Sequence, residues 1–502
     1  MPLSSDQYDR QLVANVRPVD WINPEPRDRY HLVVIGGGPG GLMAASIAAG
    51  LGARVALVER DRLGGDCLNV GCVPSKALIS AARSWRAAMD SSRVFGGPRT
   101  VGTGDFAMAM QRMGRLRAGL SRTDSAARYR ELGVHVFLGE GEFTGRDTVA
   151  VGGRVLRFRR AVIATGSRAA VPRVQGLERT GYLTNETVFA LTELPGHLIV
   201  IGAGPTGCEM AQAFARFGSR VTLVEEQGRM LPREDVDAAQ VVMRALENDG
   251  VGLLADARVL RAEPRGSSRV VHLQRDGRAE EIAGDQVLVA AGRVPSVEGL
   301  GLEAAGVAFG PRGVGVDDRL RTSNRRIFAV GDVCSQERCT HGADAQARLV
   351  VANALFFGLG GGKASRLIVP RVTYTSPEVA HVGLSLGEAI DAGYRVETIT
   401  VPLEAVDRAV LDGQDTGFLR VHLQRGGDRI LGATLVAEHA GEMIGELALA
   451  VTAGVGLGKI GATIHPYPTQ GEVVRKAADA WRRARLTPRA RRGFERFFRI
   501  FR

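Results

Sequence analysis

The stretch "YHLVVIGGGPGGLMAASIAAGLGARVALVER", residues 30–60, decides the fold of this chain of 502 residues. A short apolar strand runs into Gly36, Gly38 and Gly41, an Ala-rich helix follows, and a second strand ends at Glu59. Glycines at this spacing permit a tight turn and let a pyrophosphate approach the N-terminus of the helix, and the terminal acid can bind ribose hydroxyls. The stretch therefore predicts a βαβ unit that binds a dinucleotide.

A second copy of this pattern lies in "HLIVIGAGPTGCEMAQAFARFGSRVTLVEE", residues 197–226. Its glycines are Gly202, Gly204 and Gly207, and its acid is Glu225. In both copies the acid follows the first glycine by 23 residues. Two such units in one chain indicate that two dinucleotides exchange electrons, one as donor and one as acceptor.

The acid of the second copy also bears on the nicotinamide cofactor. A carboxylate at Glu225 can accept hydrogen bonds from the ribose of NAD and repels a 2′-phosphate. Arg220 and Arg229 lie nearby in the sequence, and their positive charges favour the 2′-phosphate of NADPH instead. We expect NAD(P)H to be the donor, with NADH favoured.

Composition and charge limit the other classes of protein. The chain is long enough for about three domains. The first thirty residues lack an apolar stretch, and no segment reaches the ~18 apolar residues of a membrane-spanning helix. Much of the net charge of +11 lies in residues 481–502, so we predict no nucleic-acid partner for the body. We expect a cytoplasmic protein.

Two of the five cysteines lie in "GGDCLNVGCVPSKAL", residues 64–78. In the reducing cytoplasm a structural disulfide is disfavoured. A structural zinc site needs about four ligands, and no second close Cys/His pair follows Cys67 and Cys72, so we predict no structural metal. Lys76 follows Cys72 by four residues, which places both side chains on one helix face, where the ammonium favours a thiolate. The pair is predicted to carry electrons.

With these features the chain resembles the class I flavoprotein disulfide reductases, which include dihydrolipoamide dehydrogenase, glutathione reductase and mercuric reductase. Four further motifs follow in the family's order: "ATGS" (164–167), "AAGRVPS" (290–296), "TSNRRIFAVGD" (322–332) and "TYTSPEVAHVG" (373–383). The resemblance implies an α/β fold of two Rossmann-like dinucleotide-binding domains and a C-terminal α+β dimerisation domain. The implied boundaries are an N-terminal arm (1–29), an FAD-binding domain (30–168 and 291–365), an NAD(P)-binding domain (169–290), a dimerisation domain (366–480) and a basic amphipathic tail (481–502).

The resemblance also assigns the cofactors and the active site. It implies that the first glycine unit binds FAD, that the second binds NAD(P)H, and that Asp332 holds the ribityl chain of the flavin. Cys72 is expected against the flavin ring and Cys67 facing the oxidant, with an exposed thiolate that attacks or binds the acceptor. Further positions that match the family's motifs are Thr165, Gly166, Gly292 and Arg293 at the cofactors, and Glu209 as the partner of Lys76.

Two departures from the family concern the chemistry at the cysteines. In "TIHPYPTQGE" (463–472) the position of the family's catalytic His is occupied by Tyr467. The Glu that holds this His in the family is retained as Glu472. A phenol is a poor base at neutral pH, and mercuric reductase also has Tyr in a PYxTxxE frame. His465 is the alternative base. Asp66 replaces the Thr before the first cysteine; it raises the pKa of Cys67 if it points inward and is harmless if it turns away.

The remaining cysteines and the tail are assigned to minor or separate roles. Cys334 and Cys339 are expected to lie near the flavin without forming a second pair, and Cys208 to pack under a helix. Phe494, Phe497, Phe498 and Phe501 recur at helical spacing with arginines on the other face, which predicts a basic amphipathic helix. Docking on its own dimer, contact with the inner face of the membrane through 489–502 and disorder all stay open.

The sequence thus predicts an FAD enzyme that takes hydride from NAD(P)H and stores two electrons in the cysteine pair. The expected acceptor is a metal ion or a small electrophile, as in mercuric reductase. The metal-delivering cysteines that such enzymes carry near their ends have no counterpart here, so a metal would need another route. The alternatives are a dihydrolipoamide dehydrogenase, a membrane-peripheral NADH:quinone reductase and a flavin-bearing redox sensor.

Overall fold

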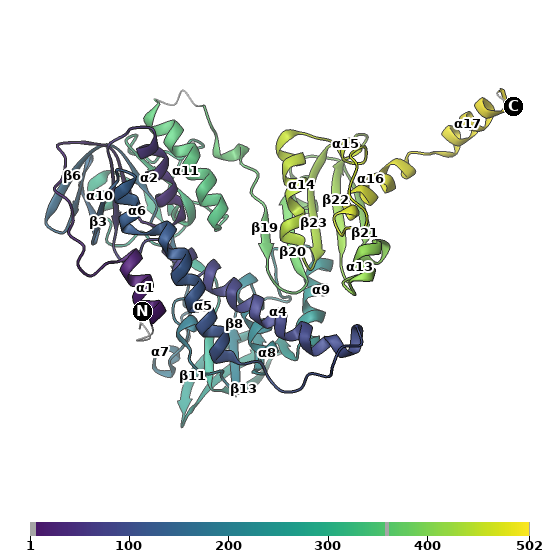
Figure 1. Cartoon of the computed structure of the whole chain (residues 1–502), viewed down its shortest axis with the longest axis horizontal. Coiled ribbons are helices and arrows are strands. Elements are labelled where there is room, and N and C mark those ends of the chain that lie inside the picture. The colour runs from purple at the N-terminus through teal and green to yellow at the C-terminus, as the bar shows by residue number, and fades with distance from the viewer. Residues whose placement is uncertain (1–6, 357–360, 501–502) are drawn as a thin grey trace. The chain divides into compact units, whose positions relative to one another are not determined.

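The computed structural model describes residues 7–356 and 361–500 and divides the chain into two compact units. Unit 1 holds the chain up to Ser92, together with Pro98–Gly228 and Gly250–Leu367. Unit 2 holds Arg93–Gly97, Arg229–Asp249 and the chain from Ile368 onward. Figure 1 shows the helices and strands of both units and labels many of them.

The first sheet of unit 1 is built around the opening glycine stretch. Its strands are β1 (Tyr30–Ile35), β2 (Val55–Glu59), β3 (His135–Leu138), β4 (Gly141–Gly145), β5 (Thr148–Val151), β6 (Arg154–Ile163) and β18 (Ile327–Ala329). The order is β3-β2-β1-β6-β5-β4, and β18 also pairs with β6. Strands β3, β2, β1, β6 and β18 run parallel, whereas β4 and β5 form an antiparallel ribbon beyond β6. The sheet therefore joins segments that lie more than 150 residues apart.

Both faces of this sheet are buried because its strands are apolar at successive positions. Leu32 and Val34 pack on one face with residues of α2 (Pro39–Gly50) and α11 (Thr340–Leu355). Val33 and Ile35 belong to the cluster on the other face, which includes Phe143 of the ribbon. A parallel sheet covered on both faces is the usual setting of a βαβ unit. The N-terminus of α2 is thereby fixed at the carboxyl end of β1.

The second sheet of unit 1 repeats this arrangement. Its strands are β8 (His197–Ile201), β9 (Arg220–Val224), β10 (Val251–Leu254) and β14 (Gln286–Val289). All pairs in the order β10-β9-β8-β14 are parallel, and α8 (Pro205–Arg216) follows β8. An antiparallel sheet lies beside it, made of β11 (Ala257–Arg265), β12 (Ser268–Arg275) and β13 (Arg278–Gly284).

Short ladders and helices complete unit 1. The strand β7 pairs antiparallel with β15, which brings the "ATGS" and "AAGRVPS" motifs together. The remaining elements are α1 (Gln7–Val16), α3 (Gly65–Asn69), α4 (Cys72–Val94), α5 (Phe106–Leu120), η1 (Ser121–Asp124), α6 (Ala126–Glu131), β7 (Ser167–Ala169), α7 (Leu177–Thr180), η2 (Val188–Ala190), β15 (Arg293–Pro295), α10 (Leu302–Ala305), β16 (Phe309–Gly310), β17 (Gly313–Val314), η3 (Gly331–Val333) and η4 (Ala364–Arg366).

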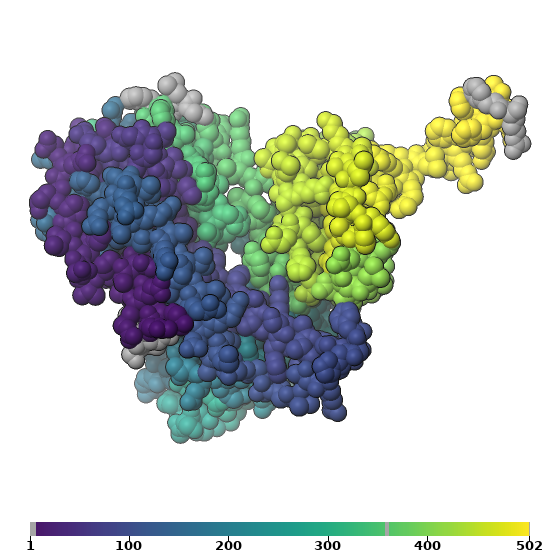
Figure 2. All heavy atoms as spheres, in the orientation of Figure 1, coloured from purple at the N-terminus to yellow at the C-terminus, as the bar shows by residue number. Residues whose placement is uncertain are grey.

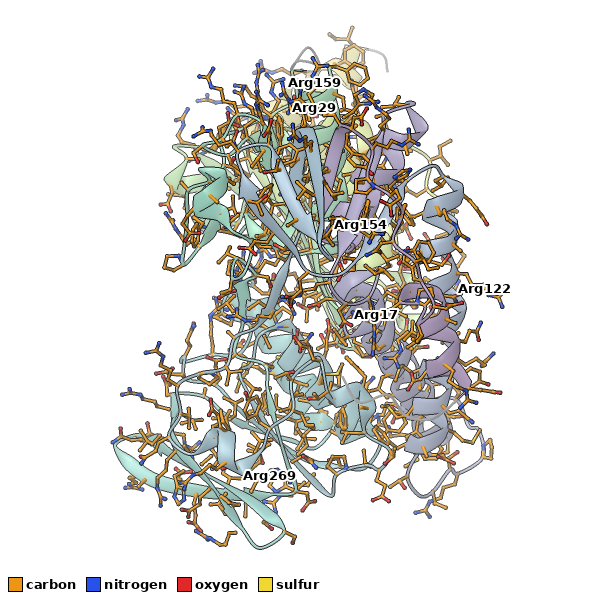
Figure 3. All side chains as sticks on the ribbon, turned by 90° about the vertical axis from the view of Figure 1, so that its left-hand side faces the viewer. Arg17, Arg29, Arg122, Arg154, Arg159 and Arg269 are labelled. Atoms are coloured by element: carbon orange, nitrogen blue, oxygen red, sulfur yellow. The ribbon has the colours of Figure 1, made fainter. Side chains whose placement is uncertain are left out.

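Arginines lie on the surface of unit 1, and Figure 3 labels Arg17, Arg29, Arg122, Arg154, Arg159 and Arg269. Arg17 lies 3.2 Å from Asp61, and Arg154 lies 2.8 Å from Glu25. These largely exposed pairs contribute little to stability.

Unit 2 is an antiparallel sheet covered by helices. Its strands are β19 (Arg371–Thr373), β20 (Glu378–Gly383), β21 (Val396–Pro402), β22 (Phe418–Gln424) and β23 (Ile430–Ala437), in the order β19-β20-β23-β22-β21. Its helices are α9 (Val236–Asn248), α12 (Leu386–Asp391), η5 (Leu403–Ala405), α13 (Asp407–Leu411), α14 (Ala440–Ala453), α15 (Leu457–Ile460), α16 (Glu472–Ala484) and α17 (Pro488–Ile500). Helix α9 belongs to unit 2, although it falls within residues 169–290, the range expected for the NAD(P)-binding domain. Arg420 of β22 forms an ion pair of 2.7 Å with Asp235, the residue directly before α9, and so links this helix to the sheet.

Candidate active site

The two glycine motifs share one backbone geometry. A Cβ added to Gly41 would lie 1.8 Å from the carbonyl oxygen of Gly36, and one added to Gly207 would lie 1.9 Å from that of Gly202. Gly36 and Gly202 adopt φ values of +104° and +101°, which side chains rarely tolerate. Only glycine therefore lets each helix start this close to the preceding strand.

The acid of each copy is held in the same way. Glu59 accepts hydrogen bonds from the backbone N–H of Gly37 at 2.6 Å and of Asp61 at 2.7 Å. Glu225 accepts from the N–H of Ala203 at 2.7 Å and of Gln227 at 3.0 Å. Burial raises the pKa of Glu59, while these backbone donors oppose the shift. Both carboxylates are thus fixed beside their glycine turns, each with lone pairs left for ribose hydroxyls.

The first cysteine lies in a short helix that packs directly on the first glycine motif. Helix α3 begins after Gly64, and a Cβ on Gly65 would lie 2.6 Å from the Cα of Gly38. The buried amide of Asn69 donates to the carbonyl oxygens of Leu63 and Gly65, which closes the turn. This close packing places Cys67 beside the predicted pyrophosphate-binding turn.

The second cysteine is the first residue of the long helix α4, so its sulfur lies at the positive end of the helix. The thiol of Cys67 donates a hydrogen bond to Cys72, which lowers the pKa of Cys72 to about 6. The hydroxyl of Thr340, 3.4 Å away, and the ammonium of Lys76 act in the same direction. The same hydrogen bond, together with burial, raises the pKa of Cys67. In the reduced pair the negative charge therefore lies on Cys72.

This charge distribution bears on the expectation that Cys67 attacks the acceptor as an exposed thiolate. Cys67 is the less exposed residue of the two, and the hydrogen bond and the burial that raise its pKa favour its protonated form. Cys67 can attack an acceptor only after its proton has left. The hydrogen-bonded thiolate of Cys72 is placed to take that proton.

Lys76 and Glu209 lie together, as the two motif positions predicted. The ammonium nitrogen donates to Oε2 of Glu209 at 2.8 Å, and the carboxylate is buried on α8. The ion pair links the helix that carries Cys72 to the helix of the second glycine motif. It positions the cation that stabilises the thiolate.

Asp66 turns toward Arg293, which decides between the two orientations left open by the sequence. The guanidinium of Arg293 donates to Oδ2 of Asp66 and, at 2.7 Å, to both the hydroxyl and the carbonyl oxygen of Ser167. Ser167 in turn donates to Oδ2 of Asp332 at 2.6 Å. Three motifs that lie far apart in sequence therefore meet in one network beside the cysteine helix.

The other three cysteines are unsuited to thiolate chemistry. Burial raises the pKa of Cys334 to about 12 and that of Cys339 to about 11. Cys208 is fully buried on α8, and burial also raises its pKa. Packing is the role that fits all three.

Tyr467 and its neighbours form a separate cluster in unit 2. The phenol hydroxyl donates to Oδ2 of Asp407 on α13 at 3.0 Å, and the ring is 69% exposed. This hydrogen bond raises the pKa of Tyr467. The phenolate, the form that could act as a base, is therefore even less populated at neutral pH than in an isolated tyrosine.

Two neighbours of Tyr467 in the sequence, Glu472 and His465, are each held by contacts within unit 2. Glu472 lies at the start of α16, where one carboxylate oxygen pairs with Arg475. The other oxygen is buried and has no hydrogen-bond partner among residues 7–356 and 361–500. The largely buried ring of His465 is held by Glu446 at 3.1 Å and by the carbonyl oxygen of Thr463 at 3.0 Å. Both ring nitrogens of His465 are thus engaged within this part of unit 2.

Thr340 and Asp407 were not predicted from the sequence. Thr340 starts α11, eight residues after Asp332, and Asp407 starts α13. A hydroxyl residue at the start of a helix that follows a cofactor motif was the one available signal for Thr340.

Comparison with known protein families shows to which family the chain belongs. The profile described as "Pyridine nucleotide-disulphide oxidoreductase" matches residues 30–347, and that of its dimerisation domain matches residues 369–478. The chain belongs to this family. It is thus a flavoprotein disulfide oxidoreductase with a dimerisation domain, and the family uses FAD and NAD(P)H.

Individual members of the family resemble the chain to similar degrees. Mercuric reductase from Streptomyces lividans is 35% identical over 90% of this chain and 96% of its own length. Dihydrolipoyl dehydrogenase from Geobacillus stearothermophilus is also 35% identical, over 89% and 95%. A solved structure described as the Cu(II) complex of the HOCl-induced flavoprotein disulfide reductase RclA from Escherichia coli has a TM-score of 0.81 at 29% identity, over 90% of this chain and all of that one.

The residues of this family member fit both cofactors. A Cβ on Gly38 would meet only the Cα of Gly65, at 3.7 Å, and one on Gly204 would meet nothing within 4 Å. The N-termini of α2 and α8 therefore offer backbone N–H groups with room for a phosphate. When bound, FAD supplies the two-electron chemistry that connects the nicotinamide to the cysteine pair. Among the described residues, no helix has the length and apolar character needed to cross a membrane.

Proposed function

We propose that this flavoprotein passes two electrons from NADH through Cys67 and Cys72 to a soft metal ion, as a mercuric reductase-like enzyme. The observation that carries the proposal is Tyr467, whose hydroxyl is bonded to Asp407 at the position where disulfide-reducing relatives hold a basic histidine. Reduction of a disulfide needs a group that protonates the leaving thiol, and this phenol does not serve as such a group at neutral pH. A metal ion has no leaving thiol.

The reduced cysteine pair suits a soft metal ion. Thiolates are the preferred ligands of such ions, and binding to both sulfurs displaces the proton that Cys67 shares with Cys72. With Hg(II) as the acceptor, NADH and Hg(II) give NAD⁺, a proton and Hg(0), so two electrons and all charges balance. Lys76, held by Glu209, stabilises the thiolate before the metal arrives.

In this proposal the cofactors are held by the glycine turns and by the network around Arg293. FAD is bound through Gly36, Gly38, Gly41, Glu59, Thr165, Gly166, Lys76 and Asp332, and the nicotinamide cofactor through Gly202, Gly204, Gly207, Glu225 and Gly292. Arg293 contributes through Ser167 and Asp332, which it holds in place.

NADH is the preferred donor in this account because of the groups around Glu225. The next acid, Glu226, lies 3.7 Å from Arg258 and leaves this role to Glu225. Arg220 lies at the opposite end of β9, about 16 Å away for a strand of this length. Arg229 donates to the carbonyl oxygens of Glu234 and Pro232. Neither arginine is thus placed to receive a 2′-phosphate.

The dimerisation domain supports a homodimer, and we propose that it completes the site. In the dimer Tyr467 and Glu472 of one protomer face the cysteine pair of its partner. There Tyr467 orients or binds the metal ion, and Asp407 fixes the phenol.

Dihydrolipoyl dehydrogenase is the second candidate because relatives with this name are as similar to the chain as mercuric reductases are. It requires an acid/base at the position of Tyr467 or a substitute for it. His465, the nearest histidine, is engaged by Glu446 and Thr463.

The test is the rate of NADH oxidation by purified enzyme with Hg(II), Cu(II), lipoamide, glutathione disulfide or a quinone as acceptor. We expect turnover with a metal ion, and expect it to be lost in Cys67→Ser. Fast lipoamide turnover would favour the dehydrogenase. Quinone turnover that survives Cys67→Ser would favour a flavin-only quinone reductase instead.

A further inference from the structure

Helix α17, Pro488–Ile500, separates its basic and apolar residues onto two faces. At 3.6 residues per turn the arginines and the single acid occupy one half of the helix, and the apolar residues occupy the other. The basic face consists of Arg489, Arg491, Arg492, Arg496 and Arg499, with Glu495 among them. The apolar face consists of Ala490, Phe494, Phe497, Phe498 and Ile500. Phe501, which extends the same pattern, lies outside the described residues.

The apolar face is not covered by the rest of unit 2. None of the helix's residues is buried, and Phe494, Phe497, Phe498 and Ile500 are 54%, 52%, 63% and 78% exposed. In Figure 2 their atoms belong to the yellow segment at the end of the colour scale. Large apolar side chains that cluster on one exposed face mark a surface that binds something.

The anchored part of the C-terminal segment ends just before this helix. Trp481 of α16 donates through Nε1 to the carbonyl oxygen of Gly427, and Arg485 pairs with Glu397 at 3.2 Å. Arg485 also stacks on the Trp481 ring, with 4.0 Å between its guanidinium carbon and the ring centroid. The packed body of unit 2 thus holds the chain up to Arg485, and α17 begins three residues later.

Charge and domain extent argue against a second copy of this chain as the partner. The chain has a net charge of +11, which does not complement a face with five arginines. The match to the family's dimerisation domain ends at residue 478, before the helix starts. An anionic lipid surface complements both faces, because phosphates receive the arginines while the phenylalanines enter the acyl boundary.

We propose that α17 lies flat on an anionic lipid surface and tethers the reductase to it. A helix of 13 residues is about 20 Å long, so it is too short to span a bilayer but suited to its interface. The arginines supply attraction that weakens as salt rises, and the phenylalanines supply insertion. This inference does not depend on which acceptor the cysteine pair reduces.

Co-sedimentation of the FAD-loaded, full-length enzyme with vesicles tests the proposal. We expect it to pellet with mixed phosphatidylcholine and phosphatidylglycerol vesicles at low salt, and not with phosphatidylcholine alone. Replacing three arginines, in R492Q/R496Q/R499Q, should weaken this binding on the order of a hundredfold. Binding that is absent, or equal on both kinds of vesicle, would overturn the proposal.

The matched control exchanges two residues between the faces. In F497R/R499F the composition and net charge stay the same, but each face gains one residue of the other kind. We expect vesicle binding to fall at least tenfold while NADH oxidation by the soluble enzyme is unchanged. If the exchange leaves vesicle binding intact, simple charge attraction explains the result and the insertion proposal fails. If it dissociates the dimer, as light scattering would report, α17 is a protein contact and the proposal also fails.

Discussion

The ammonium of Lys76 lies 2.8 Å from Oε2 of Glu209, and the two residues have opposite effects on Cys72. Lys76 lowers the pKa of Cys72 and Glu209 raises it. We therefore expect Lys76→Met to raise this pKa and Glu209→Gln to lower it. The measurement is the pH dependence of alkylation of Cys72 in the reduced enzyme, with the modified residue identified by peptide mapping. Shifts of the same sign in both variants would show that the ion pair acts through structure and not through charge.

The thiolate of Cys72 should be present across the neutral range. Its pKa is depressed to about 6 from an ordinary value near 9. The anion is therefore populated above pH 6 and is lost as the pH falls through 6. Alkylation of the wild-type enzyme, with its reduced pair, should follow one titration with this midpoint. A midpoint above pH 8 would contradict the arrangement.

The hydrogen bond from Cys67 is the largest cause of that depression. Cys67→Ala removes the donor, so the midpoint for Cys72 should rise toward its ordinary value. Cys67→Ser keeps a hydroxyl donor and serves as the matched control, with a smaller rise. Equal shifts in the two variants would show that the donor has no role.

The ion pair between Asp66 and Arg293 should matter little for stability. Asp66 is 44% exposed, so Asp66→Asn should change the free energy of unfolding by less than about 1 kcal/mol. Arg293→Met should be more severe, because it also removes the hydrogen bonds to Ser167. Urea unfolding of both variants measures this order, and the opposite order would contradict the role given to Arg293.

Glu225 should control the choice between NADH and NADPH. Glu225→Ala removes the carboxylate that repels a 2′-phosphate, so the ratio of kcat/KM for NADH to that for NADPH should fall at least about tenfold. Glu226→Ala is the neighbouring control, since that side chain lies 3.7 Å from Arg258 and is exposed. If the control shifts the ratio as much as Glu225→Ala does, the preference is set by general charge and not by this residue.

The glycine motifs and their acids were predictable from sequence because their constraints are local. The contacts of Gly36 with Gly41, and the hold on Glu59, arise within one βαβ unit. Lys76 and Glu209 lie 133 residues apart, and they were paired only because both occupy positions of family motifs.

The features that sequence reasoning missed depend on distant contacts. Thr340 touches Cys72 across 268 residues, and Arg293 sets the direction of Asp66 across 227. Which sulfur of the pair keeps the proton depends on the hydrogen bond between the two thiols, and this contact cannot be read from "CLNVGC".

The substitution Tyr467→His tests whether the side chain at this position limits the rate of disulfide reduction. An imidazole there restores an acid/base near neutral pH, so lipoamide turnover should rise about a hundredfold, within the usual range for general acid–base catalysis. Tyr467→Phe keeps the ring and removes the hydroxyl bonded to Asp407; it should lower metal-dependent turnover without a gain for lipoamide. Wild-type lipoamide turnover that Tyr467→His does not improve would contradict the assignment.

The most direct measurement is a single turnover of the NADH-reduced wild-type enzyme, mixed without oxygen with either Hg(II) or oxidised lipoamide. Free thiols are counted after quenching and removal of metal, and elemental mercury is collected as vapour. The account predicts that Hg(II) yields Hg(0) and consumes both thiols of the pair, while lipoamide leaves them titratable on the same timescale. Rapid loss of the thiols to lipoamide, with no mercury released from Hg(II), would contradict it.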